Sequence, residues 1–336
     1  LIIIYRSLNN YMKNTYHFSA DQWFAEGQRV PYDNVGKCIV FDASHQSMED
    51  GGLHVWQRVT DIHSSWPWVT MLPGFPDGSF GFVATEEYLK KSQTRRLYAE
   101  YVGMGDSDKP KDYAYSTVER ADMVEALWKH HGIEKTALVT FDIGSLVALE
   151  LLSRFIEKRG RGETPHTTIT DLVCINGGLY VDSHSHPLMT TPFLKTVFGL
   201  MLTRIAQHSP SVFKMMAKPL WSKEYAVSDK EIAENHNAIR RRDGATFLSR
   251  AAGVIDEHKR NATRWDLTRI FDATYPAISY TIAGSEEDPF EWKQVVKAKK
   301  ELGGRGVRIV MFPGGHMTTS EHPNLIADVV GVCRGN

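Results

Sequence analysis

Asp142 stands at a point in the sequence where a carboxylate could act as a nucleophile. The apolar run 137–141 precedes it, Gly144 follows two residues later, and residues 145–152 are mostly apolar and helical in character. A strand, a tight turn and a helix in this order lift the side chain at the apex above the carboxyl edge of a sheet. A carboxylate there can attack a strained or activated carbon, such as that of an epoxide or a carbon bearing a halide, and form an ester.

Two alternatives compete with a nucleophilic role for this residue. Asp142 could instead cap the helix that begins at Ile143, because a carboxylate at a helix start accepts backbone N–H groups. Ser145 could act in its place, but it falls in the first helical turn and the chain contains no G-x-S-x-G. We favour the nucleophile because an ester intermediate needs a base and an oxyanion hole, and the sequence offers both.

The expected base and acid follow in the chain order nucleophile, acid, histidine. His316 comes after the apolar run 307–312 and a Pro-Gly-Gly turn, and we expect it to activate water against the ester. The acid that orients it should come from the loop 284–289. Asp288 is preferred there because it precedes a proline, and Glu287 is the alternative because of its spacing from the preceding glycine.

The oxyanion hole is expected from backbone N–H groups. The segment Pro73-Gly-Phe-Pro76 follows the apolar run 68–72, so Phe75 would lie at the same sheet edge as the nucleophile turn. We predict that the N–H groups of Phe75 and Ile143 stabilise the charge that develops on the carboxyl oxygen.

The elements that position these residues alternate between strand and helix, so the predicted fold class is α/β with a mostly parallel sheet. A helix is predicted over 116–131, where Ser116 and Glu119 form a capping box. Short β-rich apolar runs predict seven strands, at residues 53–59, 68–72, 96–101, 136–141, 169–175, 278–283 and 307–312.

The alternation stops between residues 179 and 265. Helical patterns at 194–205, 212–216 and 230–254 fill this stretch without a strand signal, which predicts an inserted helical cap. The predicted organisation is therefore a core at 12–178, a cap at 179–265 and the rest of the core at 266–336. Residues 1–11 look foreign to the core, and Met12 would make an ordinary translation start.

The composition indicates that the binding partner of this chain is a small molecule. The chain has 39 lysines and arginines against 40 acidic residues, so no net field gathers nucleic acid or anionic membrane. Three scattered cysteines and the short apolar run 1–4 favour a cytoplasmic protein without a membrane span. We predict no cofactor, and no metal at Asp182-Ser-His184-Ser-His186, which lacks further ligands. A homodimer is one alternative for the oligomeric state.

Several motifs together resemble the epoxide hydrolase and haloalkane dehalogenase branch of the α/β-hydrolases. They are Pro-Gly-Phe-Pro, Gly103-Met-Gly-Asp-Ser-Asp-Lys-Pro110, the Asp142 turn and Gly-Gly-His316. Asn176-Gly-Gly-Leu-Tyr, His186-Pro-Leu and residues 239–244 are closest in pattern to the mesoderm-specific transcript subfamily. The resemblance implies an α/β-hydrolase fold, an aspartate, histidine and acid triad, two-step hydrolysis and a helical cap over the substrate.

Three departures from the family pattern refine the prediction. Pro73 replaces the usual histidine of His-Gly-x-Pro, and Ile143 replaces the tryptophan that donates to a departing halide in haloalkane dehalogenases. His236 stands where we would match a cap tyrosine that protonates the epoxide oxygen, with Tyr225 and Tyr180 as alternative donors. The sequence thus predicts an epoxide hydrolase acting on a small apolar substrate with water. The alternatives are a haloalkane dehalogenase and a non-catalytic ligand-binding protein.

Overall fold

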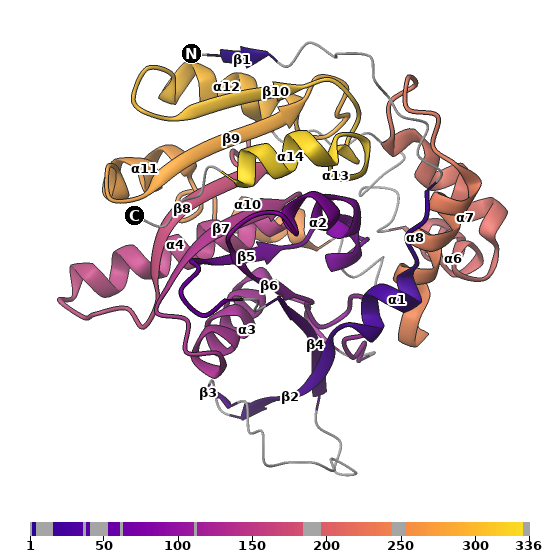
Figure 1. Ribbon diagram of the computed structural model, residues 1–336, viewed down its shortest axis with the longest axis horizontal. Coiled ribbons are helices and arrows are strands. Elements are labelled where there is room, and N and C mark those ends of the chain that lie inside the picture. The colour runs from indigo at the N-terminus through magenta and orange to yellow at the C-terminus, as the bar shows by residue number, and fades with distance from the viewer. Residues whose placement is uncertain are drawn as a thin grey trace.

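A central, mostly parallel β-sheet organises the molecule (Figure 1). The structure, a computed structural model, describes residues 2–4, 16–35, 38–40, 53–60, 63–110, 113–183, 196–243 and 253–331. The strands of the sheet lie in the order β1 (Ile2–Ile4), β10 (Arg308–Phe312), β9 (Ser279–Ser285), β8 (Thr168–Ile175), β7 (Lys135–Phe141), β5 (Trp68–Leu72), β6 (Arg95–Ala99), β4 (Leu53–Thr60), β2 (Gln28–Val35) and β3 (Cys38–Val40). Pairing is parallel from β1 to β6 and antiparallel from β6 to β3.

All seven predicted strands are confirmed, and three further strands were not predicted. Strand β2 contains Pro31, Asp33 and Asn34, residues that are depleted in strands, so its sequence gives a weak signal. Strand β3 is only three residues long. Strand β1 lies within the stretch that the sequence set apart from the core, and it pairs with β10 at one edge of the sheet.

Hydrophobic clusters cover both faces of the sheet, as the alternation of strand side chains requires. In β8, Leu172 and Cys174 point into one cluster, and Val173 and Ile175 point into the other. The first cluster packs against α3 (Thr117–His130), α4 (Gly144–Gly160), α11 (Leu267–Thr274) and α12 (Trp292–Leu302). The second packs against α1 (Ala20–Ala25), α2 (Val83–Leu89), α13 (Thr318–Glu321) and α14 (Pro323–Val330). This is the layered α/β architecture predicted from the sequence.

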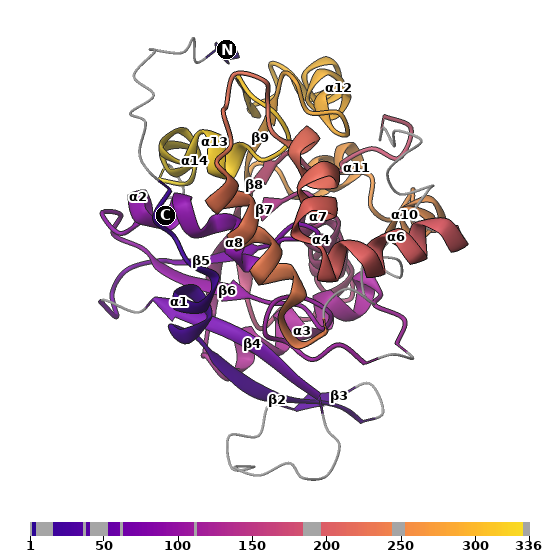
Figure 2. The same ribbon diagram turned by 90° about the vertical axis from the view of Figure 1, so that its right-hand side faces the viewer.

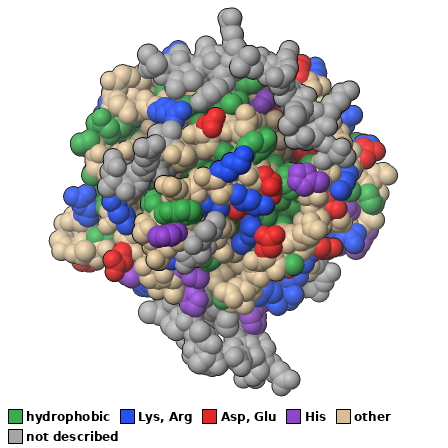
Figure 3. Space-filling view, viewed as in Figure 1, with side chains coloured by type: hydrophobic (Ala, Val, Ile, Leu, Met, Phe, Trp, Pro, Cys, Tyr) green, Lys and Arg blue, Asp and Glu red, His purple; other side chains and the backbone are tan. Residues whose placement is uncertain are grey.

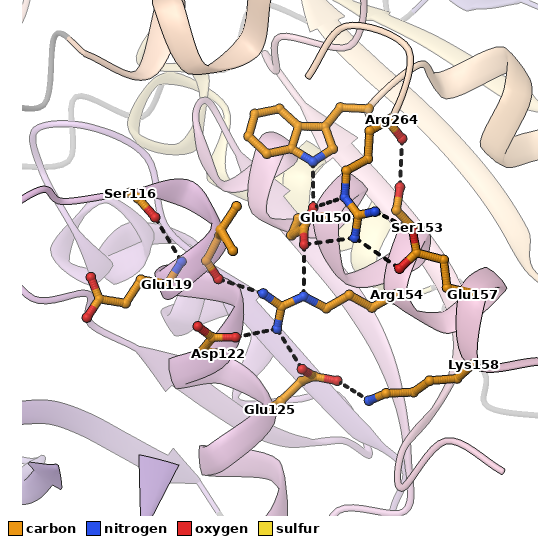
Figure 4. A network of polar contacts seen from close by, with 12 residues as sticks. Ser116, Glu119, Asp122, Glu125, Glu150, Ser153, Arg154, Glu157, Lys158 and Arg264 are labelled. Atoms are coloured by element: carbon orange, nitrogen blue, oxygen red, sulfur yellow. Dashed lines mark hydrogen bonds and ion pairs between the residues drawn. The ribbon is translucent and has the colours of Figure 1, made fainter. Parts of the chain in front are cut away.

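A network of ion pairs joins α3, α4 and the segment that leads into α11 (Figure 4). Arg154 of α4 donates to Asp122 and Glu125 of α3 and to Glu150 one turn earlier. The buried Glu150 also accepts from Arg264 and from the indole N–H of Trp265 at 2.7 Å. Glu150 is therefore the buried centre of a network that fixes three separate parts of the chain.

The helices between residues 196 and 243, which follow β8, form a group beside the sheet, at the right of Figure 1. They are α6 (Val197–His208), α7 (Pro210–Ala217), the short 3-10 helix η2 (Lys218–Leu220) and α8 (Asp229–Arg240). We call residues 196–243 the helical segment. Figure 2 shows α8 lying next to α1. In the described part of the chain, no helix is both long and apolar enough to cross a membrane.

The predicted helix over 230–254 is wrong in its extent. Helix α8 ends at Arg240, and Arg242 has a φ of 49°, which breaks the helix. The next helix that the structure describes is α10 (Val254–Arg260). The start of the first predicted cap helix, and residues 244–252, lie outside the described residues, as do His184 and His186 of the histidine motif.

Candidate active site

The predicted turn at Asp142 is confirmed in its geometry. Asp142 follows β7 directly and has a φ of 50°, a left-handed conformation that L-residues rarely adopt. Its carbonyl oxygen accepts the N–H of Ser145 at 3.0 Å, which closes the turn into α4. A Cβ on Gly144 would lie 2.4 Å from the carbonyl oxygen of Leu72, so only glycine fits beside the end of β5.

Ser145 is turned away from the apex. Its side chain is fully buried, and its hydroxyl lies 2.7 Å from the hydroxyl of Thr140 in β7. A Cβ on Gly177 would meet the Ser145 hydroxyl at 1.9 Å, so the backbone after β8 closes over it. In this conformation Ser145 has no path to a substrate above the sheet edge.

The Asp142 carboxylate lies between a backbone donor and the predicted base. The N–H of Phe75 donates to Oδ2 of Asp142 at 2.8 Å, and Oδ1 lies 4.0 Å from Nε2 of His316. Phe75 belongs to the loop after β5, as predicted, and a Cβ on Gly74 would touch the Cβ of Asp142 at 2.8 Å. Ile143, the other predicted donor, directly precedes α4 as its N-cap residue.

Asp288, and not Glu287, contacts the histidine. Nδ1 of His316 lies 3.0 Å and 3.1 Å from the two carboxylate oxygens of Asp288, and both side chains are buried. Glu287 is exposed, and its electrostatic neighbours are Glu224, Lys223 and Glu286. Burial disfavours the imidazolium of His316, but the charge and hydrogen bond of Asp288, with the charge of Asp142, outweigh it and raise the pKa of His316 to about 9.

Two side chains that the sequence did not single out hold the histidine loop. The amide of Asn176, just after β8, donates to the carbonyl oxygen of His316 at 2.8 Å and accepts the N–H of Ser285. Glu321 accepts the N–H of Gly315 at 3.1 Å and the hydroxyl of Ser222 at 2.6 Å. Asn176 therefore joins the histidine loop to the end of β9, and Glu321 joins it to the helical segment.

Asp77 is a third carboxylate near the Asp142 group, and the sequence reasoning missed it. Its side chain is buried, and Oδ2 has no hydrogen-bond partner among the described residues. Burial raises the pKa of Asp77 to about 7, with His316 opposing the rise and Asp142 adding to it. Asp77 directly follows Pro76 of the predicted oxyanion loop, and this position in the sequence could have identified it as a site residue.

The structure places the three candidate proton donors in different surroundings. Tyr225 donates to Glu231 at 2.9 Å and follows Leu220, whose carbonyl oxygen accepts the N–H of Met317 beside the histidine. His236 lies 2.8 Å from the carbonyl oxygen of Ala206 and stacks on a ring of α7, within the helical segment. Burial lowers its pKa.

Tyr180 lies on the other side of the sheet edge. Its hydroxyl is 3.3 Å from that of Thr268 in α11, and its ring lies under the ammonium of Lys297 in α12. Tyr225 comes three residues after Ser222, whose hydroxyl donates to Glu321 beside the histidine loop.

Comparisons with known proteins agree with this architecture. A sequence model of the alpha/beta hydrolase fold family matches residues 67–236, half of the chain, so the chain belongs to that family. The fold predicted from the sequence is thus confirmed by both the sheet order and the family match.

The chain also resembles individual members of the family. It is 32% identical over 201 residues to the mesoderm-specific transcript homolog protein of Bos taurus. The aligned region covers 59% of this chain and 58% of the relative's length. The chain is 25% identical over 264 residues to a putative hydrolase, LipZ, of Mycobacterium tuberculosis, covering 78% of this chain and 86% of that one. The solved haloalkane dehalogenase DbeA of Bradyrhizobium elkani has a TM-score of 0.65 at 16% identity, over 91% of this chain and 97% of that one.

Proposed function

We propose that this chain is a hydrolase that opens epoxides through an ester on Asp142. The observation that carries the proposal is the carboxylate at the apex of the turn, with the N–H of Phe75 on one oxygen and His316 facing the other. Asp288 supports the histidine from the opposite side of its ring. These are the groups that a nucleophile, a base and an oxyanion hole require.

In the first step, one oxygen of Asp142 bonds to an epoxide carbon and the carbon–oxygen bond of the ring breaks. The ring oxygen takes a proton from an acid, for which we propose Tyr225, because its segment packs on the histidine loop. The helical segment would act as a cap that excludes bulk water from this step. The product of the step is an alkyl ester of Asp142.

In the second step, His316 takes a proton from a water molecule that attacks the carbonyl carbon of the ester, which is the carboxyl carbon of Asp142. The N–H groups of Phe75 and Ile143 stabilise the oxyanion, and Asp288 stabilises the imidazolium. The alkyl oxygen leaves with the proton from His316 as the second hydroxyl of a diol. The proton that Asp142 then releases restores the donor, so the sum is one epoxide and one water to one diol.

Dehalogenation is the weaker alternative for this site. A departing halide needs a hydrogen-bond donor beside the nucleophile, and the Ile143 side chain, 6% exposed and apolar, offers none. An epoxide oxygen stays bonded to the substrate and needs only one proton, which a tyrosine can supply.

Mass spectrometry of the His316→Gln protein tests the proposal. The substitution removes the base of the second step, so incubation with a panel of epoxides and haloalkanes should trap an adduct on the peptide that contains Asp142. The Asp142→Asn protein is the control and should remain unmodified. An adduct on Ser145, labelling by a fluorophosphonate, or no adduct from folded protein across the panel would contradict the proposal, and the last result favours a non-catalytic binding protein.

A further inference from the structure

Arg120 is a buried arginine whose guanidinium has no hydrogen-bond partner among the residues that the structure describes. It lies in the first turn of α3 and is 2% exposed, and its Nε, Nη1 and Nη2 atoms have no partner among the described residues. The guanidinium carbon lies 5.5 Å from the ring centre of Tyr101. An unpaired charge in a protein interior is strongly unfavourable. A folded protein that keeps such a cation has a use for it.

Other arginines of this protein show how a buried guanidinium is normally paired. Arg96 is fully buried, and its Nε donates to Glu86 at 2.8 Å. Arg154 of the neighbouring helix α4 donates to three carboxylates and a carbonyl oxygen (Figure 4). The missing hydrogen bonds of Arg120 are therefore a feature of its own surroundings and not of the arginines of this protein in general. Positive and negative side chains are mixed on the face drawn in Figure 3, whereas Arg120 is only 2% exposed.

Two hydroxyls near Arg120 are also buried and unpaired among the described residues. The hydroxyl of Tyr101 and Oγ1 of Thr117 are buried and have no hydrogen-bond partner in the described part of the chain. Thr117 precedes Arg120 by three residues, so the two side chains lie on neighbouring positions of one helix face. The guanidinium carries only donors, and each hydroxyl can donate one hydrogen bond, so the three groups together can donate to an anion.

Glu257, a carboxylate that acts electrostatically on Arg120, is already engaged by a backbone group. Oε2 of Glu257 in α10 accepts the N–H of Thr117 at 2.8 Å and so caps the start of α3. Burial lowers the pKa of Arg120, and the charges of Tyr101, Glu257 and Asp142 oppose that shift. Neither carboxylate forms a described ion pair with Arg120, yet both are near enough to act on it electrostatically.

The position of Arg120 relative to the nucleophile follows from the topology. Tyr101 comes two residues after β6, and Asp142 comes one residue after β7. Both strands run parallel to β5 on either side of it, so their carboxyl ends meet at one sheet edge. Helix α3 leaves this edge, and Arg120 lies in its first turn. The unpaired guanidinium therefore lies at the edge of the sheet that carries Asp142.

We propose that Arg120, with the hydroxyls of Tyr101 and Thr117, binds a carboxylate group of the substrate whose reactive carbon meets Asp142. This inference rests on the proposed function and names its substrate class, a small epoxide with an apolar body and one carboxylate. A monoanion matches the single charge of the guanidinium, and a carboxylate matches its planar fork. A phosphate dianion would leave excess negative charge beside Glu257 and Asp142.

A binding experiment tests the anion site apart from the chemistry. The protein is Asp142→Asn, which cannot form the ester, and the probe is butyrate, with butyramide as the neutral match at equal ionic strength. Butyrate should raise the unfolding temperature because it binds only the folded state, and butyramide should not. The added substitution Arg120→Met should abolish the shift, and without ligand that variant should unfold at the same or a higher temperature. Tyr101→Phe, which removes only a hydroxyl, should reduce the shift.

A trapping experiment tests the substrate class. The His316→Gln protein is incubated with 2,3-epoxypropanoate or with its neutral amide, and the rate of adduct formation on Asp142 is followed by intact mass. We expect the carboxylate to react roughly 100-fold faster than the amide, and Arg120→Met to remove that preference. Equal rates, together with no effect of butyrate on unfolding, would overturn the inference and leave the Asp142 nucleophile standing. Stabilisation by butyrate through Arg120 without any adduct would support the anion site and contradict the ester mechanism.

Discussion

The side-chain amide of Asn176 donates to the main-chain oxygen of His316 at 2.8 Å. The same side chain bonds to Ser285 through both its amide nitrogen and its oxygen. The histidine loop is thus held against the strand ends by one residue that does not touch the Asp142 carboxylate.

Replacing Asn176 with alanine should slow turnover without a matching loss of substrate affinity. The loop loses a buried hydrogen bond, so Nε2 of His316 is no longer held opposite Asp142. We expect kcat to fall about 10-fold or more, in line with misplacement of a catalytic group, while KM changes little. Steady-state kinetics, with a substrate of the class that forms the trapped adduct, measure kcat and KM. Asn235→Ala, which removes a buried amide bonded within α8, is the matched control and should leave kcat unchanged.

Ester hydrolysis should accelerate as the pH rises and His316 loses its proton. The base must be neutral to accept a proton from water, and Asp288 raises the pKa of His316. The charge of Asp142, which adds to the rise to about 9 in the free protein, is absent in the ester, so the midpoint should lie below about 9. Single-turnover decay of the ester, followed by rapid quench from pH 6 to 10, measures this dependence. In Asp288→Asn the midpoint should move to lower pH, because the largest opposing charge is gone. A rate that is flat from pH 6 to 9 would contradict the assignment of His316.

The raised pKa of His316 also predicts how the free energy of unfolding depends on pH. His316 binds its proton more tightly folded than unfolded, so its contribution to the free energy of unfolding is full below about pH 6.5 and is lost as the pH rises through about 9. In urea titrations, His316→Gln should therefore lose stability relative to the parent at pH 6 and match it more closely at pH 10.

Asp77 should destabilise the fold as the pH rises from about 4 to 7. Its pKa is raised from its ordinary value to about 7, so the folded state retains a proton that the unfolded chain releases in that range. Asp77→Asn removes this penalty and keeps the shape of the side chain. We expect the variant to be more stable than the parent at pH 8, by on the order of 2 kcal/mol, and equal to it at pH 4. Equal stability at both pH values would show that Asp77 is not shielded from water as the structure describes.

Glu150→Gln should strongly destabilise the protein. The substitution leaves Arg154 and Arg264 without the buried carboxylate that accepts from both, and breaking such a network costs about 3 kcal/mol. Chemical denaturation measures the loss. The control is Glu163→Gln, whose partner Arg161 is exposed, and its unfolding midpoint should not change detectably. Similar losses in the two variants would mean that the network of Figure 4 is not buried in solution.

The sequence predicted the sheet and the nucleophile turn because both depend on local pattern. Buried parallel strands such as β5 are continuous apolar runs, and the turn needs Gly144 at a fixed offset from Asp142. The preference for Asp288 over Glu287 rested only on the proline that follows Asp288, and local pattern left Glu287 as an alternative. Adjacent carboxylates on one loop differ only in which of them the loop conformation turns inward.

Arg120 escaped the sequence reasoning for a different reason. A single arginine on a helix normally extends into solvent, and nothing within α3 marks this one as buried. Its burial depends on Tyr101 from another strand end and on α10, more than 130 residues later in the chain. The lack of a partner can be recognised only after these elements have been assembled.

Three described hydrogen bonds between the helical segment and the histidine loop link the position of residues 220–222 to that of His316. Leu220 accepts from Met317, and Ser222 donates twice to Glu321, which also holds the N–H before His316. Any movement that carries residues 220–222 outward breaks these bonds and releases the loop that orients the imidazole. In the proposed mechanism, with the helical segment as a cap, an open molecule would therefore admit substrate while the base is out of position, and water would attack the ester only after reclosure.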